Sequence, residues 1–153
     1  MKHHIGVIII IKDRDRILLI QETKPECHGK WCFPVGHTEP NETTFAAAIR
    51  EAKEETGYDV KVTNTLGLLT WAMDDNLRSA PVFTADITGG SPSERLINES
   101  SSVEWFTLDE IQNMAASGQL RFPRSTLSIA DRLFKNQTYS TDFILDIDEG
   151  QGS

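Results

Sequence analysis

The chain has 153 residues, of which 39% are hydrophobic and 25% charged, with 10 glycines and 6 prolines. This composition predicts a single globular domain over residues 1–153 and excludes collagen-like, low-complexity and disordered classes. The 23 acidic residues outnumber the 15 basic ones, and the formal net charge of −8 excludes duplex nucleic acid as a favoured partner, because its phosphates repel an acidic surface.

The first apolar runs, 5–11 and 17–20, predict a β-hairpin that turns at 13–15, with its first strand buried on both faces. A short extended piece at 31–35 separates two loops, 24–30 and 36–41, that contain Pro, Gly and His. The strongest helix signal covers 43–56, which lacks Gly and Pro and precedes Gly57.

Later in the chain the signals alternate between strand and helix. Strands are predicted at 58–62, 66–71, 81–87 and 103–106. A capping box from Thr107 to Glu110 begins a second helix, and a third follows Pro123. We therefore expect a mixed α/β domain with a core at about 5–134 and an acidic, solvated C-terminal tail.

The location of the chain is predicted from its cysteines and its apolar runs. Cys27 and Cys32 are too few for a disulfide-stapled fold and suit a reducing compartment. The run 5–11 is short for a signal peptide and lacks a small-residue cleavage site. No stretch approaches the roughly 20 apolar residues of a membrane span. We therefore expect a cytoplasmic protein without a membrane partner.

The helix over 43–56 is predicted to have an apolar side and an acidic side. On a wheel of about 100° per residue, the side expected to lie on a sheet carries Phe45, Ala48, Ile49 and Ala52. Another side carries Glu51, Glu54 and Glu55. Their like charges repel one another, and the negative end of the helix dipole disfavours them further.

These three carboxylates need a compensating positive charge. Arg50 lies four residues before Glu54 and offsets part of the repulsion. A dense cluster of hard oxygen atoms also suits Mg²⁺, with Mn²⁺ as a substitute. A solvated acidic helix face is the alternative that the glutamates alone leave open.

Residues before the helix complete a longer pattern. Gly36 is followed by five residues, Glu42, seven residues and then the segment REAKEETGY, which ends at Tyr58. This pattern resembles the Nudix box, and at background residue usage a chance match is on the order of one in a million. The preceding hairpin and the segment 103–110 extend the resemblance over about 5–134.

The resemblance to the Nudix hydrolases implies an α/β fold, an αβα sandwich with a mixed β-sheet. It implies that the metal ion is held by Glu51, Glu54, Glu55 and the Gly36 carbonyl. Arg50 would orient the glutamates, and Glu42 would brace the preceding loop. Val35 departs from the family pattern, which usually has a glycine at that position.

The reaction implied by the resemblance is Mg²⁺-dependent hydrolysis of a diphosphate linkage. The expected substrate is a small phosphate compound, either a nucleoside di- or triphosphate or another nucleoside diphosphate linked to X. Within the family, 31–34 and 120–123 resemble the nucleoside tri- and diphosphatases that also accept thiamine-pyrimidine pyrophosphate. The expected catalytic residues are Arg50, Glu51, Glu54 and Glu99.

Glu99 and the expected substrate-binding residues lie outside the box. Trp71 could stack on a base, and Arg78 and Arg121 could pair with phosphate, although core or surface positions are their alternatives. Glu99 lies in the polar loop 91–102, from which the family often takes a further carboxylate. Its competitors for that role are Glu94 and Glu104. Trp105 is expected in the core.

Three other interpretations compete with a Nudix hydrolase. A zinc site would use Cys27, His28, Cys32 and His37, whose spacing is irregular. A diphosphate isomerase of the same fold would use Cys32 as a catalytic residue. A catalytically inactive nucleotide-binding module would have no use for three repelling carboxylates. The oligomeric state is open, and a homodimer is among the alternatives.

Overall fold

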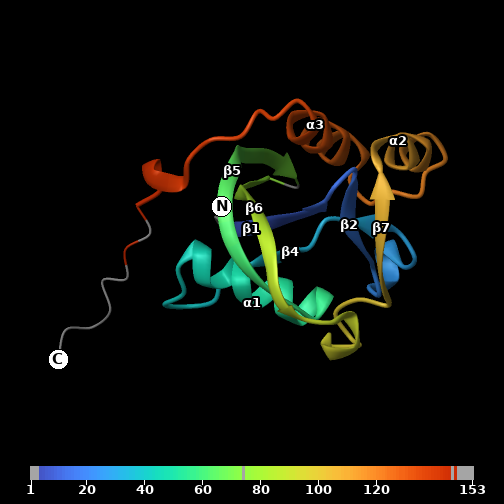
Figure 1. The fold of residues 1–153 in the computed structure, drawn as a ribbon. Coiled ribbons are helices and arrows are strands. Elements are labelled where there is room, and N and C mark those ends of the chain that lie inside the picture. Colours follow the sequence, from blue (N-terminus) through green and yellow to red (C-terminus); the bar gives the residue numbers. More distant parts are fainter. Residues whose placement is uncertain (1–3, 74, 146, 148–153) are drawn as a thin grey trace.

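The computed structural model describes residues 4–73, 75–145 and 147. The elements, in chain order, are β1 (His4–Asp13), β2 (Arg16–Gln21), η1 (Pro25–Cys27), β3 (Trp31–Cys32), β4 (Val35–His37), α1 (Thr44–Thr56), β5 (Tyr58–Met73), β6 (Asn76–Gly90), η2 (Pro92–Glu94), β7 (Ser102–Thr107), α2 (Leu108–Ala116), α3 (Pro123–Phe134) and η3 (Thr141–Phe143). Figure 1 shows α2 and α3 close together and α1 at a distance from both.

The seven strands of the described residues form a mixed sheet, in which five follow the order β3-β2-β1-β6-β5. β1 runs parallel to β6 and antiparallel to β2, β4 pairs with β1, and β7 pairs with β2. One edge of β1 pairs with β6, and the other edge pairs with β4 at 6–8 and with β2 at 12–13. β1 is therefore the central strand of the fold.

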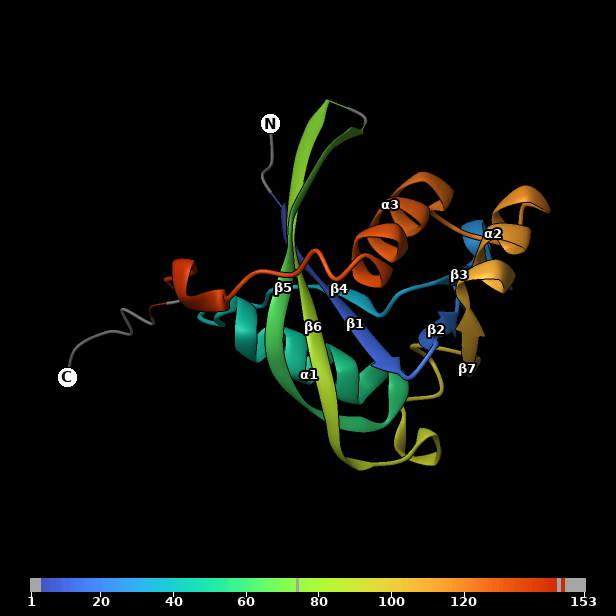
Figure 2. The ribbon, with the colours of Figure 1, turned by 45° about the horizontal axis from the view of Figure 1, so that its top comes forward.

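β1 separates two apolar clusters, which explains its continuous run of isoleucine and valine. Ile8 and Ile10 face one cluster with residues of α2 and α3, whereas Val7, Ile9 and Ile11 face the other cluster with residues of α1. Figure 2 shows α1 on one side of the long β5–β6 hairpin and α3 on the other. The prediction that this strand is buried on both faces is confirmed for 7–11, whereas Ile5 at its start is 48% exposed.

Helix α1 begins and ends where the sequence predicts. The Thr43 side chain caps it by accepting from the Ala46 N–H, and Gly57 ends it in a left-handed conformation with φ of 79°. The side predicted to face the sheet is wrong in one position, because Ile49 is 45% exposed and Ala47 is fully buried. The buried face of α1 therefore carries Glu51 and Glu55 in addition to its alanines.

Three other predictions differ from the structure. The strands predicted at 58–62 and 66–71 are one strand, β5, whose pairing with β6 shifts register at three points. Residues 36 and 37 of the expected loop form β4 together with Val35, because they pair with β1. Ordered contacts continue past 134, where Tyr139 and Thr65 exchange two backbone hydrogen bonds of 2.8 and 2.9 Å. The end of the predicted acidic tail, 148–153, lies outside the described residues.

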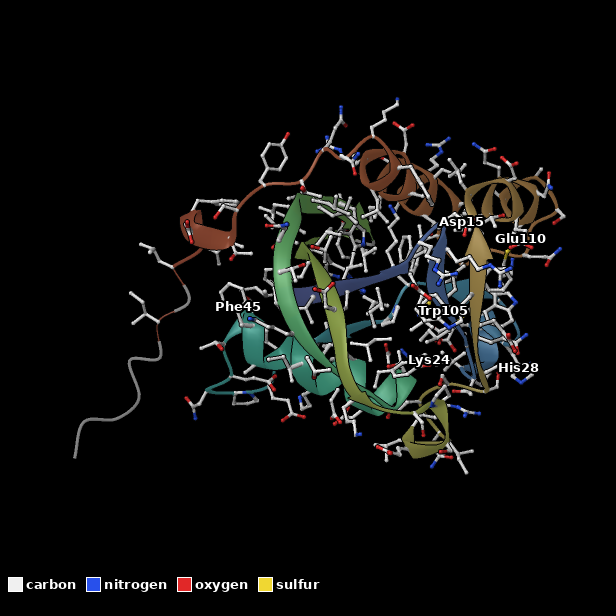
Figure 3. The ribbon with its side chains drawn as sticks, in the orientation of Figure 1. Asp15, Lys24, His28, Phe45, Trp105 and Glu110 are labelled. Atoms are coloured by element: carbon white, nitrogen blue, oxygen red, sulfur yellow. The ribbon has the colours of Figure 1, made fainter. Side chains whose placement is uncertain are left out.

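Phe45 and Trp105 extend the cluster on the α1 side of the sheet. Phe45 lies at the start of α1 (Figure 3). Its ring stacks on Phe83 with centroids 4.9 Å apart. Trp105 is partly buried and packs against the same cluster, as expected of a core residue. Among the described residues, none of the helices has the length and apolar character needed to cross a bilayer.

Candidate active site

Strand β4 brings Gly36 directly against the acidic side of α1. A Cβ atom at Gly36 would lie 1.9 Å from Glu51 Cδ, so a side chain at this position would displace the Glu51 carboxylate. The neighbouring Val35 N–H donates to Glu55 Oε2 over 2.9 Å. The backbone of β4 therefore lies directly against the carboxylates of two glutamates of α1.

Arg50 binds the surrounding glutamates with most of its guanidinium donors. Its Nε and Nη2 donate to the two Glu42 oxygens over 2.7 and 3.0 Å. Its Nη1 donates to Glu51 Oε1 over 2.9 Å and to Glu54 Oε2 over 3.1 Å. Nη2 also donates to the main-chain oxygen of His37 over 2.9 Å. Arg50 thus joins the loop before α1 to two of the three glutamates predicted as ligands.

The pKa values of these glutamates are shifted in different directions by their environments. The hydrogen bond from Arg50 lowers the pKa of Glu42. Burial raises the pKa of Glu51, which is 8% exposed, and raises that of Glu55, which is 6% exposed, well above its ordinary value. The negative charges of Glu51, Glu22 and Glu99 raise the pKa of Glu55 further.

The donor atoms fit a hard divalent cation. Glu42, Glu51 and Glu54 share the single positive charge of Arg50. Glu51 and Glu55 are buried where water cannot compensate their charges. Such oxygen clusters suit Mg²⁺. In the described ranges, no group of three or more His, Cys, Asp or Glu side chains is already gathered closely enough to hold a metal ion. A bound cation would balance part of the negative charge of the glutamates that Arg50 balances in this structure.

The loop between β6 and β7 is attached to the C-terminal end of α1. The Leu96 N–H donates to the main-chain oxygen of Glu54 over 2.8 Å, and the Ser100 hydroxyl donates to that of Glu55 over 2.6 Å. Helix ends leave such carbonyls without partners inside the helix. The loop therefore provides hydrogen-bond donors for the last carbonyls of α1, and the same hydrogen bonds hold the loop beside the glutamates.

This attachment distinguishes the three carboxylates considered for an additional role. Glu99 precedes the buried Ser100 and borders the cleft described below. Glu94 instead forms an ion pair with Lys53 on α1. Glu104 is exposed on β7 and lines a different, shallow depression.

A cleft of about 340 Å³ lies over Gly36 and the buried glutamates. It brings together eight of the predicted site residues: Gly36, Arg50, Glu51, Glu55, Trp71, Arg78, Glu99 and Arg121. Glu54 is not among its lining residues, and its side chain, 30% exposed, pairs with Arg50. Three of the predicted glutamates and three arginines thus line a common space.

Two predicted substrate-binding residues occupy neighbouring strands. Trp71 on β5 pairs with Arg78 on β6, and both border the cleft. Arg78 Nε is buried and has no hydrogen-bond partner within the described part of the chain. Trp71 also packs against an apolar core cluster, so its ring is partly buried.

Sequence reasoning missed Glu22. This residue follows β2, is 3% exposed, and forms an ion pair with Arg121, which lies 99 positions later. The one signal for Glu22 in the sequence is its position, as an acidic residue directly after a buried strand. The zinc alternative gains no support, since Cys32 donates its thiol to Glu22 and the described residues contain no metal-holding group.

Comparisons with known proteins agree with this fold and this box. The NUDIX domain family matches residues 2–125. The mouse 8-oxo-dGDP phosphatase NUDT18 is 43% identical over 109 residues, 67% of this chain and 32% of that protein. The NAD-capped RNA hydrolase NudC of Vibrio atlanticus is 30% identical over 114 residues, 74% of this chain and 41% of that protein.

A solved NUDIX hydrolase from Nitrosomonas europaea superposes with a TM-score of 0.87 at 24% identity, over 97% of this chain and 100% of that one. The α/β Nudix fold is therefore confirmed, and the chain belongs to the NUDIX domain family. The family generally uses divalent metal cations. The chain spans about a third of the length of the mouse relative and about two fifths of the Vibrio relative.

Proposed function

We propose that this chain is a Mg²⁺-dependent pyrophosphohydrolase. Its substrate would be a nucleoside di- or triphosphate, or another nucleoside diphosphate linked to X. The observation that carries the proposal is the juxtaposition of Glu51 and Glu55 against Gly36, in a cleft that Arg78 and Arg121 also line. The names of the mouse and Vibrio relatives support nucleotide phosphates as the substrate class.

Glu51, Glu54, Glu55 and the Gly36 carbonyl would hold the Mg²⁺ ion, for which Mn²⁺ could substitute. When bound, such an ion neutralises charge on a diphosphate and lowers the pKa of water. Arg50 orients Glu51 and Glu54 through its Nη1 hydrogen bonds. The burial of Glu55 explains why a cation, rather than solvent, should balance its charge.

Other residues of the cleft would bind the substrate and remove a proton. Arg78 and Arg121 would pair with phosphate oxygens, which bind guanidinium groups through charge-assisted hydrogen bonds. Trp71 would stack on a planar base. Glu99, or else Glu51, would accept the proton of the attacking water. We also propose that the chain forms a single domain and acts in the cytoplasm.

Release of hydrolysis products over a substrate panel, separated by chromatography, tests this function. The panel holds nucleoside di- and triphosphates, 8-oxo-dGDP, a nucleoside diphosphate sugar and thiamine-pyrimidine pyrophosphate, each with Mg²⁺ and with EDTA. We expect Mg²⁺-dependent release from at least one compound. Nucleotide binding without release from any of them would instead support the catalytically inactive module.

A further inference from the structure

We infer that Glu22 is a positioning residue of the cleft, which holds the Arg121 guanidinium where it can bind phosphate oxygens of the substrate. This role rests on the proposed function, because it takes the ligand of the cleft to be a diphosphate. Glu22 itself is absent from the residues that line the cleft, whereas Arg121 lines it. Glu22 would therefore act through Arg121 rather than on the substrate.

The Glu22 carboxylate is held rigidly. The Glu22 backbone N–H donates to the main-chain oxygen of Lys30 over 2.8 Å, and the main-chain oxygen of Glu22 accepts from the Gly29 N–H over 3.0 Å. Its side-chain Oε1 accepts from Arg121 Nη1 and, over 3.3 Å, from Cys32 Sγ. A buried carboxylate with fixed backbone and side-chain partners has little freedom to move when a ligand enters the cleft.

Arg121 is attached to the same part of the sheet. Its backbone N–H donates to the Trp31 oxygen over 2.9 Å, and the adjacent Leu120 forms a bridge with Trp31. Its guanidinium lies 4.6 Å from the Phe122 ring centroid, and its side chain is 22% exposed. The backbone and one face of the guanidinium are therefore both restrained.

The free donors of Arg121 make this restraint useful for binding. Within the described residues, the guanidinium uses Nη1 for its hydrogen bond to Glu22, which leaves the Nη2 and Nε donors for another acceptor. Guanidinium groups bind phosphate through two parallel donors, so orientation decides the strength of the contact. An arginine held by a buried carboxylate loses less rotamer freedom when it binds an anion.

A purely structural role is the competing explanation, in which the ion pair only ties the segment before α3 to β2. The two roles differ in what they change. A structural pair affects the melting temperature and leaves substrate affinity alone. A positioning pair changes KM, and its effect disappears when Arg121 is removed, because Glu22 then has nothing to position.

A double-mutant cycle separates these roles, with kcat, KM and melting temperature measured for each variant. We expect Glu22→Gln to raise KM about tenfold or more while kcat stays within about threefold, in line with the loss of a hydrogen bond to a charged group. Arg121→Gln should raise KM at least as much. The double variant should bind no more weakly than Arg121→Gln alone.

Asp131→Asn is the matched control, because it removes an exposed ion pair with Lys135 from α3. Its KM should equal that of the wild type. An unchanged KM in Glu22→Gln, or effects of the two substitutions that add fully, would overturn the positioning role. If Glu22→Gln does not fold, Arg121→Lys provides the decision, since it keeps the charge pair but loses the planar fork. Wild-type affinity in Arg121→Lys would also overturn the role.

Binding of methylenediphosphonate, an analogue of diphosphate that cannot be hydrolysed, separates this inference from the proposed function. Calorimetry with Mg²⁺ should give tighter binding to the wild type than to Glu22→Gln. A wild type that binds the probe but hydrolyses no substrate would refute the hydrolase and still allow the two affinities to decide the role of Glu22. A wild type that binds no diphosphate would overturn both.

Discussion

Glu51, Glu54 and Glu55 occupy one stretch of α1, yet the fold gives them different environments. Glu51 and Glu55 are buried, and Glu55 accepts from the backbone of β4. The Glu54 side chain is 30% exposed and is neutralised in part by Arg50. Substitutions that remove one charge without changing shape should therefore affect stability differently at each position.

Glu54→Gln should lower kcat by at least ~10²-fold with little loss of stability, because removal of one charge-stabilising element of a metal site typically has an effect of that size. Steady-state kinetics and thermal unfolding of the purified variant measure both quantities. In EDTA its melting temperature should equal or exceed that of the wild type, since repulsion on α1 is relieved. Glu104→Gln on β7 is the control, and wild-type turnover in Glu54→Gln would refute the metal-site assignment.

Glu55→Gln should stabilise the metal-free chain at neutral pH. The pKa of Glu55 is raised in the folded state, so its favourable contribution is present at low pH and is lost as pH rises through the folded pKa. Melting in EDTA between about pH 5 and pH 8 should show the variant more stable than the wild type at neutral pH, with a difference that shrinks as pH falls. A difference that grows toward low pH would contradict this environment for Glu55.

At the scale of elements, the end of α1 determines which loop reaches the cleft. Gly57 ends the helix in the left-handed region, and a Cβ there would lie 2.0 Å from the Ser91 oxygen. The following loop donates to the last carbonyls of α1 through Leu96 and Ser100. This docking places Glu99 at the cleft and leaves Glu94 paired with Lys53.

Glu99→Gln should lower kcat about 10²-fold or more if Glu99 accepts the proton, and the acidic limb of the pH profile should shift or vanish. Glu94→Gln is the matched control from the same loop, and its profile should follow the wild type. The measurement is kcat against pH for all three proteins. An unchanged profile in Glu99→Gln would return the role of base to Glu51.

At the scale of the whole molecule, an acidic chain must bind an anionic substrate. The formal net charge is −8, and the cleft itself contains glutamates beside its arginines. A divalent cation between the carboxylates and the diphosphate would reconcile these charges. Cation binding should therefore be visible in the stability of the complete chain as well as in its activity.

Mg²⁺ or Mn²⁺ should raise the melting temperature of the wild type, because a ligand that binds the folded state alone stabilises it by about 2.7 kcal/mol at 100 times its Kd. The shift should be much smaller in Glu54→Gln and Glu55→Gln. Activity should require either ion and should survive a zinc-selective chelator, since the proposed ligands are hard oxygens. Equal shifts in all three proteins would place the cation elsewhere.

Local chemistry along the chain was sufficient to predict the ends of α1 and the pairing of Arg50 with an acidic residue on it. Thr43 and Gly57 mark the helix ends because a cap and a left-handed residue act on neighbours within one turn. The pairing of Arg50 with Glu54 follows from a spacing of four. The apolar run in β1 likewise predicted a strand buried on both faces, because it contains no polar alternate residues.

The tertiary structure alone decided which residues share the cleft. The Glu22–Arg121 pair joins positions 99 residues apart. Sequence spacing did not exclude Glu94 and Glu104 as competitors of Glu99, whereas the attachment of the loop to α1 brings Glu99 to the cleft. Ile49 faces solvent because the helix turns Glu51 and Glu55 inward against β4, which hydropathy does not predict. Such contacts depend on strand order and helix docking, and the spacing of neighbouring residues in the sequence carries no information about either.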